Sequence, residues 1–216
     1  MISFIERSDL VLDITEELRI IIEESRFYEE INRSEVYLKN RFSEDLSYWH
    51  DPEPRLKLSP EELNEFAAKH SNDPEVSKLG MTRHFFNEAW KQGLVNYMDS
   101  DYKYWNKEVP QKVREAVEKI GVDFHKITLN ELKPHTGLVL HRDGVRKYHY
   151  PVITNPHCFM YDASNVANQK VYHLEQGKLY NVDTCRDHYV YNASDETRYH
   201  MIMSYGRLGE FDEQMG

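Results

Sequence analysis

The chain has 216 residues, of which 40% are hydrophobic and 30% are charged, proportions that are ordinary for a globular protein. This length suits one domain with a sizeable core, or one domain with a helical extension. The formal net charge of -10 argues against non-specific binding to nucleic acid or to anionic lipid, since both attract positively charged surfaces.

The apolar segments and the cysteines restrict the class of protein further. No apolar run approaches the length of a membrane span, and no signal-peptide core is evident, so we expect a cytoplasmic protein. The two cysteines, Cys158 and Cys185, form no CxxC or zinc-finger spacing. We expect two reduced, buried thiols rather than a disulfide.

Helical patterns dominate the first 120 residues. Ser59 is followed by Pro60 and Glu62, which is the pattern of a serine-capped helix start. Another predicted helix begins at Pro110 and ends at Gly121. The apolar residues that mark the helices at helical spacing are Ile14, Leu18, Ile21 and Ile22; Phe85, Phe86, Ala89 and Trp90; and Val113, Ala116, Val117 and Ile120.

After Gly121, short β-rich runs separated by turn residues replace the helical patterns. Gln176-Gly177 and residues 193–196 have the composition of hairpin connections. Closely spaced strands favour a sandwich or barrel over a parallel sheet. The predicted strands are residues 122–132, 137–141, 147–154, 171–174, 178–182, 188–192 and 197–205.

No linker, repeat or low-complexity segment divides the chain. We therefore interpret residues 1–216 as a single α+β domain. In this interpretation residues 1–120 are mainly helical support, and residues 121–216 form the β-rich catalytic core.

The motif His141-Arg142-Asp143, followed by His188, is the most informative feature of the chain. Successive strand residues point to opposite faces, so His141 and Asp143, two apart, can point the same way. His188 opens another predicted strand. Two imidazoles and one carboxylate bind Fe(II) on one face and leave the other positions open. A lone HxD arises often by chance, so the prediction needs a further residue.

Arg198 is that residue. We interpret residues 188–192 and 197–205 as a hairpin that turns near Ser194. Residues placed symmetrically about a turn face each other roughly 5 Å apart, and His188 and Arg198 are so placed. Arginine pairs bidentately with a carboxylate and keeps its charge at any working pH. Together these residues predict an oxygenase with an acid cosubstrate.

At this point the sequence resembles a known family. From Asn130 to Tyr205 it is similar to the Fe(II)/2-oxoglutarate-dependent oxygenases, particularly their aspartyl/asparaginyl β-hydroxylase-like branch. The resemblance covers roughly the C-terminal third of the chain. It rests on PHTGLVLHRD at 134–143, YHYPVITNP at 148–156, GKLYNVD at 177–183 and RYHMI at 198–202, with His188 and Asn192 between the last two.

The resemblance implies a fold and a site. The implied fold is a double-stranded β-helix, a jelly-roll or cupin-like barrel, with the helical N-terminal portion packed on it. Some members of the branch lack the carboxylate ligand, but Asp143 is present here, so a full triad is expected. The implied iron ligands are His141, Asp143 and His188. The implied cosubstrate contacts are Arg198 at the distal carboxylate of 2-oxoglutarate, His149 as a second contact and Asn130 as a weaker candidate.

The activity implied by the resemblance is oxidative. An amino-acid side chain of a protein, a peptide or a free amino acid would be hydroxylated with O2 and 2-oxoglutarate, giving succinate and CO2. We expect neither a nucleic acid nor a membrane partner. The alternatives are an inactive metal-binding or sensing module, a cupin metalloenzyme that does not use 2-oxoglutarate, and a nucleic acid demethylase, which the charge balance disfavours.

His135 is the rival for the first ligand, because an HTG motif has that role in some relatives. His141 is preferred because it has an acid two residues further on and the right distance from Pro134. His149 serves equally well as a cosubstrate contact or as a hydrogen-bonded core histidine.

Overall fold

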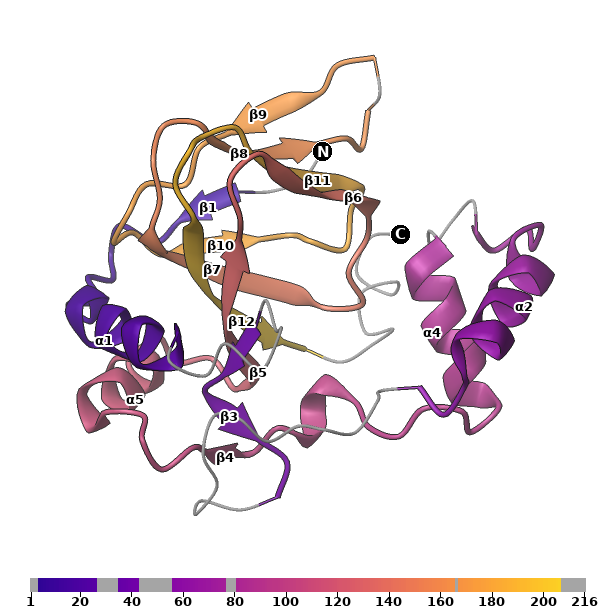
Figure 1. Cartoon of the computed structure of the whole chain (residues 1–216), viewed down its shortest axis with the longest axis horizontal. Coiled ribbons are helices and arrows are strands. Elements are labelled where there is room, and N and C mark those ends of the chain that lie inside the picture. Colours follow the sequence, from indigo (N-terminus) through magenta and orange to yellow (C-terminus); the bar gives the residue numbers. More distant parts are fainter. Residues whose placement is uncertain (1–3, 27–34, 43–55, 77–80, 166, 207–216) are drawn as a thin grey trace.

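A computed structural model describes residues 4–26, 35–42, 56–76, 81–165 and 167–206, and two antiparallel sheets form its centre (Figure 1). The larger sheet contains, in spatial order, β1 (Phe4–Glu6), β10 (Tyr180–Val182), β7 (Arg146–Ile153), β12 (Arg198–Tyr205), β5 (Phe124–Leu132) and β2 (Glu35–Tyr37). The smaller sheet contains β6 (Thr136–His141), β11 (His188–Asn192), β8 (Cys158–Asp162) and β9 (Lys170–Tyr172). From β5 onward the chain passes repeatedly from one sheet to the other. This arrangement of two facing sheets is a double-stranded β-helix.

The helices lie in two places (Figure 1). Helices α1 (Thr15–Arg26) and α5 (Gln111–Glu118) cover the outer face of the larger sheet. Helices α2 (Pro60–His70) and α4 (Met81–Lys91) form a pair on another side of the barrel. A short 3-10 helix, η1 (Asp99–Asp101), and a small sheet of β3 (Lys39–Asn40) and β4 (Tyr104–Trp105) complete the described elements. No helix in these ranges is long and apolar enough to cross a membrane.

The four predicted helices are present. The α2 start is the predicted capping box: Ser59 accepts from the Glu62 backbone N–H at 3.2 Å, and the Glu62 carboxylate accepts from the Ser59 N–H at 2.8 Å. Helix α5 begins at Gln111, with Pro110 as its N-cap, and Gly121 follows its end at a φ of +72°. Local apolar spacing and caps were therefore sufficient to place the helices.

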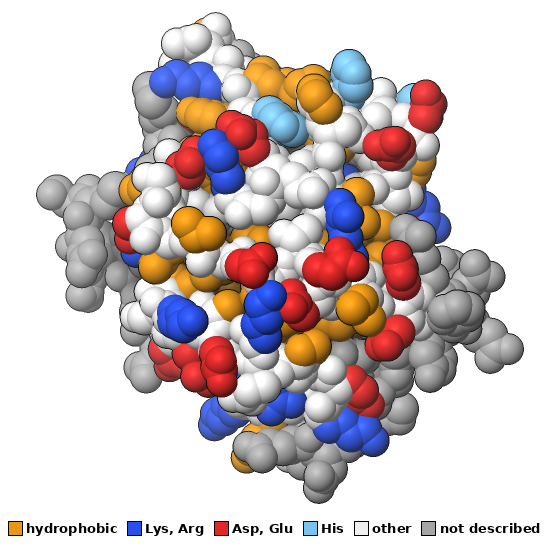
Figure 2. Space-filling model, turned by 90° about the vertical axis from the view of Figure 1, so that its left-hand side faces the viewer, with side chains coloured by type: hydrophobic (Ala, Val, Ile, Leu, Met, Phe, Trp, Pro, Cys, Tyr) orange, Lys and Arg blue, Asp and Glu red, His pale blue; other side chains and the backbone are white. Residues whose placement is uncertain are grey.

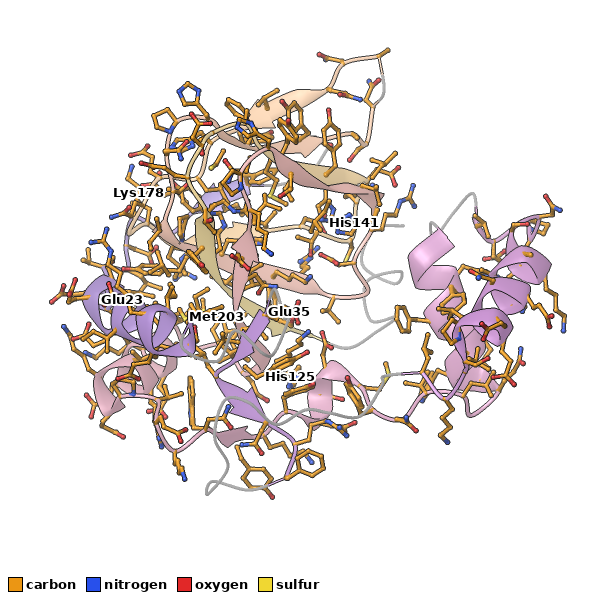
Figure 3. All side chains as sticks on the ribbon, in the orientation of Figure 1. Glu23, Glu35, His125, His141, Lys178 and Met203 are labelled. Carbon is orange, nitrogen blue, oxygen red and sulfur yellow. The ribbon has the colours of Figure 1, made fainter. Side chains whose placement is uncertain are left out.

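The larger sheet has two faces with different roles, because side chains alternate along each strand. One face of β5, β7 and β12 packs against α1 and α5 and forms the main core; its members include Ile127, Leu129, Tyr148, Tyr150, Val152, Tyr199, Met201 and Met203. Met203 lies on the side of α1 in Figure 3. The opposite face is turned into the barrel and carries the polar residues Lys126, Asn130, Lys147, His149, Arg198 and His200.

The predicted hairpin between residues 188–192 and 197–205 is wrong. β11 pairs with β6 and β8 in the smaller sheet, whereas β12 pairs with β5 and β7 in the larger one. The buried Asn192 side chain holds the turn between the two strands. Its Nδ2 donates to the Leu132 carbonyl at 3.0 Å and to the Glu196 carbonyl at 2.7 Å, and its Oδ1 accepts from the Ser194 hydroxyl at 2.7 Å. These bonds tie the turn to the end of β5 instead of closing it into a hairpin.

The connection at Gln176-Gly177 is not a hairpin either, because β9 pairs with β8 while β10 pairs with β1 and β7. The Gly177 N–H donates to the Pro151 carbonyl at 2.9 Å, so this turn joins the end of β7. β8 and the N-terminal strands β1 to β4 were not predicted. Of the two free cysteines, Cys158 is buried as expected and Cys185 is half-buried.

Candidate metal centre

His141, Asp143 and His188 meet where β6 and β11 lie side by side. His141 ends β6, and it is the register partner of His188, the first residue of β11. Asp143 follows in the next turn, where its backbone N–H donates to the Thr184 carbonyl at 2.9 Å. In Figure 3 His141 lies on the side of the barrel that faces α4. The three predicted ligands therefore come together, although the hairpin used to predict part of the site does not exist.

The imidazoles of the two histidines flank the Asp143 carboxylate. His141 Nε2 is 3.8 Å from Oδ1, and His188 Nε2 is 3.6 Å from Oδ2. The two ring centroids are 4.3 Å apart. One potential ligand atom from each of the three residues lies within 4.8 Å of the other two, which is close enough to surround a single metal ion.

Backbone carbonyls select the histidine tautomers. His141 Nδ1 is 2.7 Å from the Val139 carbonyl oxygen, and His188 Nδ1 is 2.8 Å from the Arg186 carbonyl oxygen. A carbonyl oxygen only accepts hydrogen bonds, so each Nδ1 carries the hydrogen and donates it. Each Nε2 is then left with a lone pair directed at the shared site, which is the arrangement that metal-binding histidines use.

The charges at the cluster also suit a divalent cation. Burial would raise the pKa of Asp143, but the Lys147 ammonium, 2.9 Å from Oδ2, and the neighbouring imidazoles lower this pKa to about 2. Burial lowers the pKa of His188. At neutral pH the cluster therefore offers the Asp143 carboxylate and the neutral His188 imidazole. With the His141 ring they make up the 2-His-1-carboxylate set of non-haem Fe(II) sites.

An arginine that was not singled out as a site residue braces the cluster. The Arg142 guanidinium donates from Nε to Asp187 Oδ1 at 2.5 Å and from Nη2 to Oδ2 at 2.8 Å. This bidentate pair joins the turn after His141 to the residue before His188, so it fixes the spacing of two ligand-bearing segments. An Arg-Asp pair accompanies both histidines in the sequence, at 142–143 and 186–187, but the partners are not evident without the fold.

Arg198 lies inside the barrel rather than opposite His188. Arg198 is 6% exposed, and its buried Nε has no hydrogen-bond partner among the described residues. No carboxylate in the described ranges forms an ion pair with it. Burial lowers the pKa of the guanidinium to about 10, so it is still charged at neutral pH. A buried cation without an anionic partner is costly, and a bound carboxylate would offset that cost.

Two histidines border the same small cavity as Arg198. His149 and His200 are both buried, and neither nitrogen of either ring has a hydrogen-bond partner within the described part of the chain. Burial, together with the Lys147 and Arg198 charges, lowers the pKa of His149 to about 3. Burial likewise lowers the pKa of His200 well below its ordinary value. Two neutral rings thus present unused hydrogen-bonding atoms beside a buried guanidinium, and His200 was not among the residues that the sequence predicted for the site.

The cavity beside Arg198 measures only about 10 Å³, room for one water-sized group. Its apolar walls include Met160, Leu174 and Val190. A cosubstrate carboxylate needs more room than this, so its entry requires side chains in the wall to move. Methionine is the wall residue best able to do so, because it is unbranched and flexible.

A second, larger cavity of about 290 Å³ opens beside Asp143. Its floor is the inner face of β5, and Phe86 and Trp90 of α4 form part of its wall. Asn130 lies here with its side chain engaged, donating to Glu35 Oε1 at 2.8 Å and accepting from the Thr128 hydroxyl at 2.6 Å. The structure therefore places Asn130 at this larger cavity, whereas His149 lies at the Arg198 cavity.

His135, the rival for the first ligand, lies elsewhere. Its exposed side chain has Nε2 2.8 Å from Asp195 Oδ1, at the far end of β6 from His141. His173 is also outside the cluster, with Nδ1 3.1 Å from the Cys158 carbonyl oxygen.

Comparison with known proteins gives one family and several distant structures. The family described as aspartyl/asparaginyl beta-hydroxylase matches residues 56–207. The crystal structure of AviO1 from Streptomyces viridochromogenes Tue57 is 15% identical with a TM-score of 0.46, over 95% of this chain and 90% of that chain. A Pseudomonas putida prolyl-4-hydroxylase is 13% identical with a TM-score of 0.40, over 96% of this chain and 93% of that chain.

An oxidoreductase of the 2OG-Fe(II) oxygenase family from Burkholderia pseudomallei is 10% identical with a TM-score of 0.36, over 45% of this chain and 52% of that chain. No curated protein sequence matches this chain. The family match spans more than half of the chain and contains the whole His141, Asp143 and His188 cluster. The chain therefore belongs to the aspartyl/asparaginyl β-hydroxylase family of oxygenases.

Proposed function

We propose that this oxygenase uses Fe(II) and 2-oxoglutarate to hydroxylate an amino-acid side chain, with succinate and CO2 as co-products. The observation that carries the proposal is the combination of two sites in one barrel. The His141, Asp143 and His188 cluster offers a facial set of metal donors, and the buried Arg198 offers an unpaired cation to an acid. We further propose that residues 1–216 act as one catalytic domain, with the N-terminal helices as support.

His141, Asp143 and His188 would hold the iron through two Nε2 atoms and one carboxylate oxygen. Bound iron would supply the activation of O2, which no side chain can provide. The chain's own contribution is to hold the ligands: backbone carbonyls orient both rings, and the Arg142–Asp187 pair fixes their spacing. Nickel and zinc bind the same kinds of donor, so selection of iron also depends on metal supply.

Arg198 would bind the distal carboxylate of 2-oxoglutarate, and His149 or His200 would donate a hydrogen bond to it. This pairing would satisfy the buried guanidinium and at least one of the unused ring nitrogens. The pairing also argues against the alternative of a cupin metalloenzyme without an acid cosubstrate, because such an enzyme would leave Arg198 buried and unpaired. The same reason counts against a module that only binds metal, because a metal ion would not pair with the Arg198 cation.

The 290 Å³ cavity beside Asp143 is the proposed substrate site. Its wall combines the aromatic Phe86 and Trp90 with the charged Lys126 and Glu35. Such a mixture suits a polar or charged amino-acid side chain better than an apolar ligand. The substrate would be a small molecule, a peptide or a protein.

Nucleic acid is not proposed as a partner. Figure 2 shows one face of the molecule, where acidic and basic side chains are interspersed and no continuous basic patch is visible. The net charge of -10 agrees with this, since binding to a phosphate backbone rewards concentrated positive charge.

Succinate formation tests the proposal. Purified protein given Fe(II), O2 and 2-oxoglutarate should release succinate slowly even without substrate. Asp143→Ala should abolish the release, because the metal loses its carboxylate ligand. The matched control is His135→Asn, since asparagine tolerates the positive φ of 53° at that exposed position.

Two results would count against the proposal. Succinate release by Asp143→Ala at the wild-type rate would remove Asp143 from the site. A metal-loaded wild type that binds no 2-oxoglutarate in titration calorimetry would instead support the metal-binding module.

A further inference from the structure

A second group of metal-binding side chains lies in the α2–α4 pair. His70 is the last residue of α2, Asp73 follows in the turn, and His84 is in α4. The ring centroids of His70 and His84 are 5.6 Å apart, and His84 Nε2 is 3.3 Å from Asp73 Oδ2. One potential ligand atom from each of the three residues lies within 4.8 Å of the other two.

One ring nitrogen of each histidine in this group is buried without a hydrogen-bond partner among the described residues. The Nε2 atoms of both His70 and His84 are inaccessible to solvent and have no hydrogen-bond partner among the described residues. The His84 side chain is only 4% exposed. Its contact with Asp73 is close enough for charge interaction but does not have hydrogen-bond geometry. Buried polar atoms that lack a partner are destabilising, and a cation between the three residues would bind all of them.

Neighbouring groups orient two of the three side chains, Asp73 and His70. The Glu75 backbone N–H donates to Asp73 Oδ1 at 2.9 Å, which orients the carboxylate and leaves Oδ2 toward His84. The Phe66 ring lies against His70, with centroids 4.5 Å apart, and it also meets Phe85 edge-on at 5.1 Å. Metal ligands are commonly oriented by such neighbours.

We propose that His70, Asp73 and His84 form a second metal site that binds a zinc-type divalent cation, with water in the fourth position. Zinc binds His nitrogen and Asp oxygen at about 2.0–2.2 Å, so two ligand atoms of a tetrahedral site are roughly 3.3 Å apart. The Asp73–His84 pair already has that separation. The ligand atoms of the whole group lie within 4.8 Å of one another, so His70 has to approach the other two by about 1.5 Å at most to complete such a site.

A structural metal is useful at this place because the core of the helical pair is small. Its buried members are Phe66, Phe85 and Ala89, with a few partly buried residues around them. Small units that cannot build a large core are commonly stabilised by a bound metal. The site would also fix the turn after α2 to α4, and α4 carries Phe86 and Trp90 into the wall of the proposed substrate cavity.

The test first removes the barrel site, so that only the second site can bind. His141→Ala/His188→Ala protein is stripped with a chelator, loaded with excess zinc, freed of unbound zinc by gel filtration, and analysed for metal content. It should retain about one zinc per chain, and zinc should raise its unfolding temperature by a few degrees. Adding Asp73→Asn should abolish both effects. Adding His157→Ala, an exposed histidine outside both groups, should change neither.

Failure of the barrel double variant to bind or be stabilised by zinc would overturn the proposal. Unchanged zinc retention after Asp73→Asn would do the same. If that variant loses helical signal in circular dichroism, His84→Gln replaces it. The barrel double variant remains decisive in that case, because it keeps the second site intact. The result does not depend on whether the barrel uses 2-oxoglutarate.

Discussion

His141 and His188 are direct register partners across β6 and β11, and each ring donates from Nδ1 to a backbone carbonyl two residues earlier in the chain. The sheet register and the ring orientation are thus set by the same pair of strands. A change that separates the strands should therefore affect metal binding even when it touches no ligand.

Gly137→Ala makes such a change. A Cβ at Gly137 would lie 2.5 Å from the Val190 backbone oxygen, too close for an ordinary contact. The strands must move apart, so we expect metal affinity to fall roughly tenfold or more, comparable to the loss of a ligand-orienting group. Val139→Ala is the control, because Val139 is on the same strand and 83% exposed. Unaltered affinity in Gly137→Ala, measured by metal titration, would show that the register is not what positions the histidines.

Arg198→Met should separate stability from function. The buried guanidinium lacks a carboxylate partner among the described residues, so methionine should maintain or raise the unfolding temperature of the protein without cosubstrate. It should also abolish the stabilisation by 2-oxoglutarate that we expect for the wild type, while metal content stays unchanged. Differential scanning fluorimetry with and without 2-oxoglutarate measures both effects. Equal stabilisation of the variant and the wild type would remove Arg198 from the cosubstrate site.

Asn192→Ala should destabilise the whole barrel. The buried amide bonds to the Leu132 and Glu196 carbonyls and to Ser194, and its loss leaves these groups unsatisfied. We expect a loss of about 2–4 kcal/mol in the free energy of unfolding, from more than one broken buried hydrogen bond. Urea unfolding followed by fluorescence measures it. Asn165→Ala, in an exposed turn, is the comparison, and similar losses in both would mean that the turn network is unimportant.

Acid should weaken the protein partly through Glu35. Burial would raise the pKa of Glu35, but Lys126 and Asn130 lower it below the ordinary 4.5. The folded state therefore takes up this proton less readily than the unfolded state. The resulting stability is complete above about pH 4.5 and is lost as the pH falls through the lower, folded pKa.

Glu35→Gln removes this contribution. The variant should be less stable than the wild type at neutral pH, and the difference should shrink as the pH falls below about 4.5. Unfolding temperatures measured from pH 7 to pH 3 give the comparison, with Glu65→Gln on the exposed face of α2 as the control. A difference that is constant over this range would show that the Glu35 charge is not involved.

The sequence predicted what depends on near neighbours in the chain. Helix α2 follows from its capping box and most strands follow from local composition, because these signals lie within a few residues. The HxD motif likewise identified the first two members of the cluster. The pairing of strands was not predictable in this way, because Asn192 directs the turn after β11 through bonds to Leu132, 60 residues away in the chain.

The same distinction applies to the site. Arg198 was selected from a hairpin that does not form, yet it lies in the barrel because β12 crosses to the other sheet. The Arg142–Asp187 pair and the buried His200 were missed, since their roles depend on contacts between distant segments. The His70, Asp73 and His84 group was missed for the same reason: its spacing matches no common motif.

The two-faced construction of β12 bears on how such an enzyme can change during evolution. Tyr199, Met201 and Met203 build the core with α1 and α5, whereas the residues between them face the cavities. Substitutions at inward positions such as Ile202 and Ser204 would change the lining of the proposed substrate cavity while the core stays intact. A single-residue insertion, in contrast, would turn the core-facing side chains of β12 toward the cavities and the cavity-facing side chains toward the core. Substitutions on the inward face of this strand can therefore change the cavity without disturbing the core, and length changes should be confined to the loops.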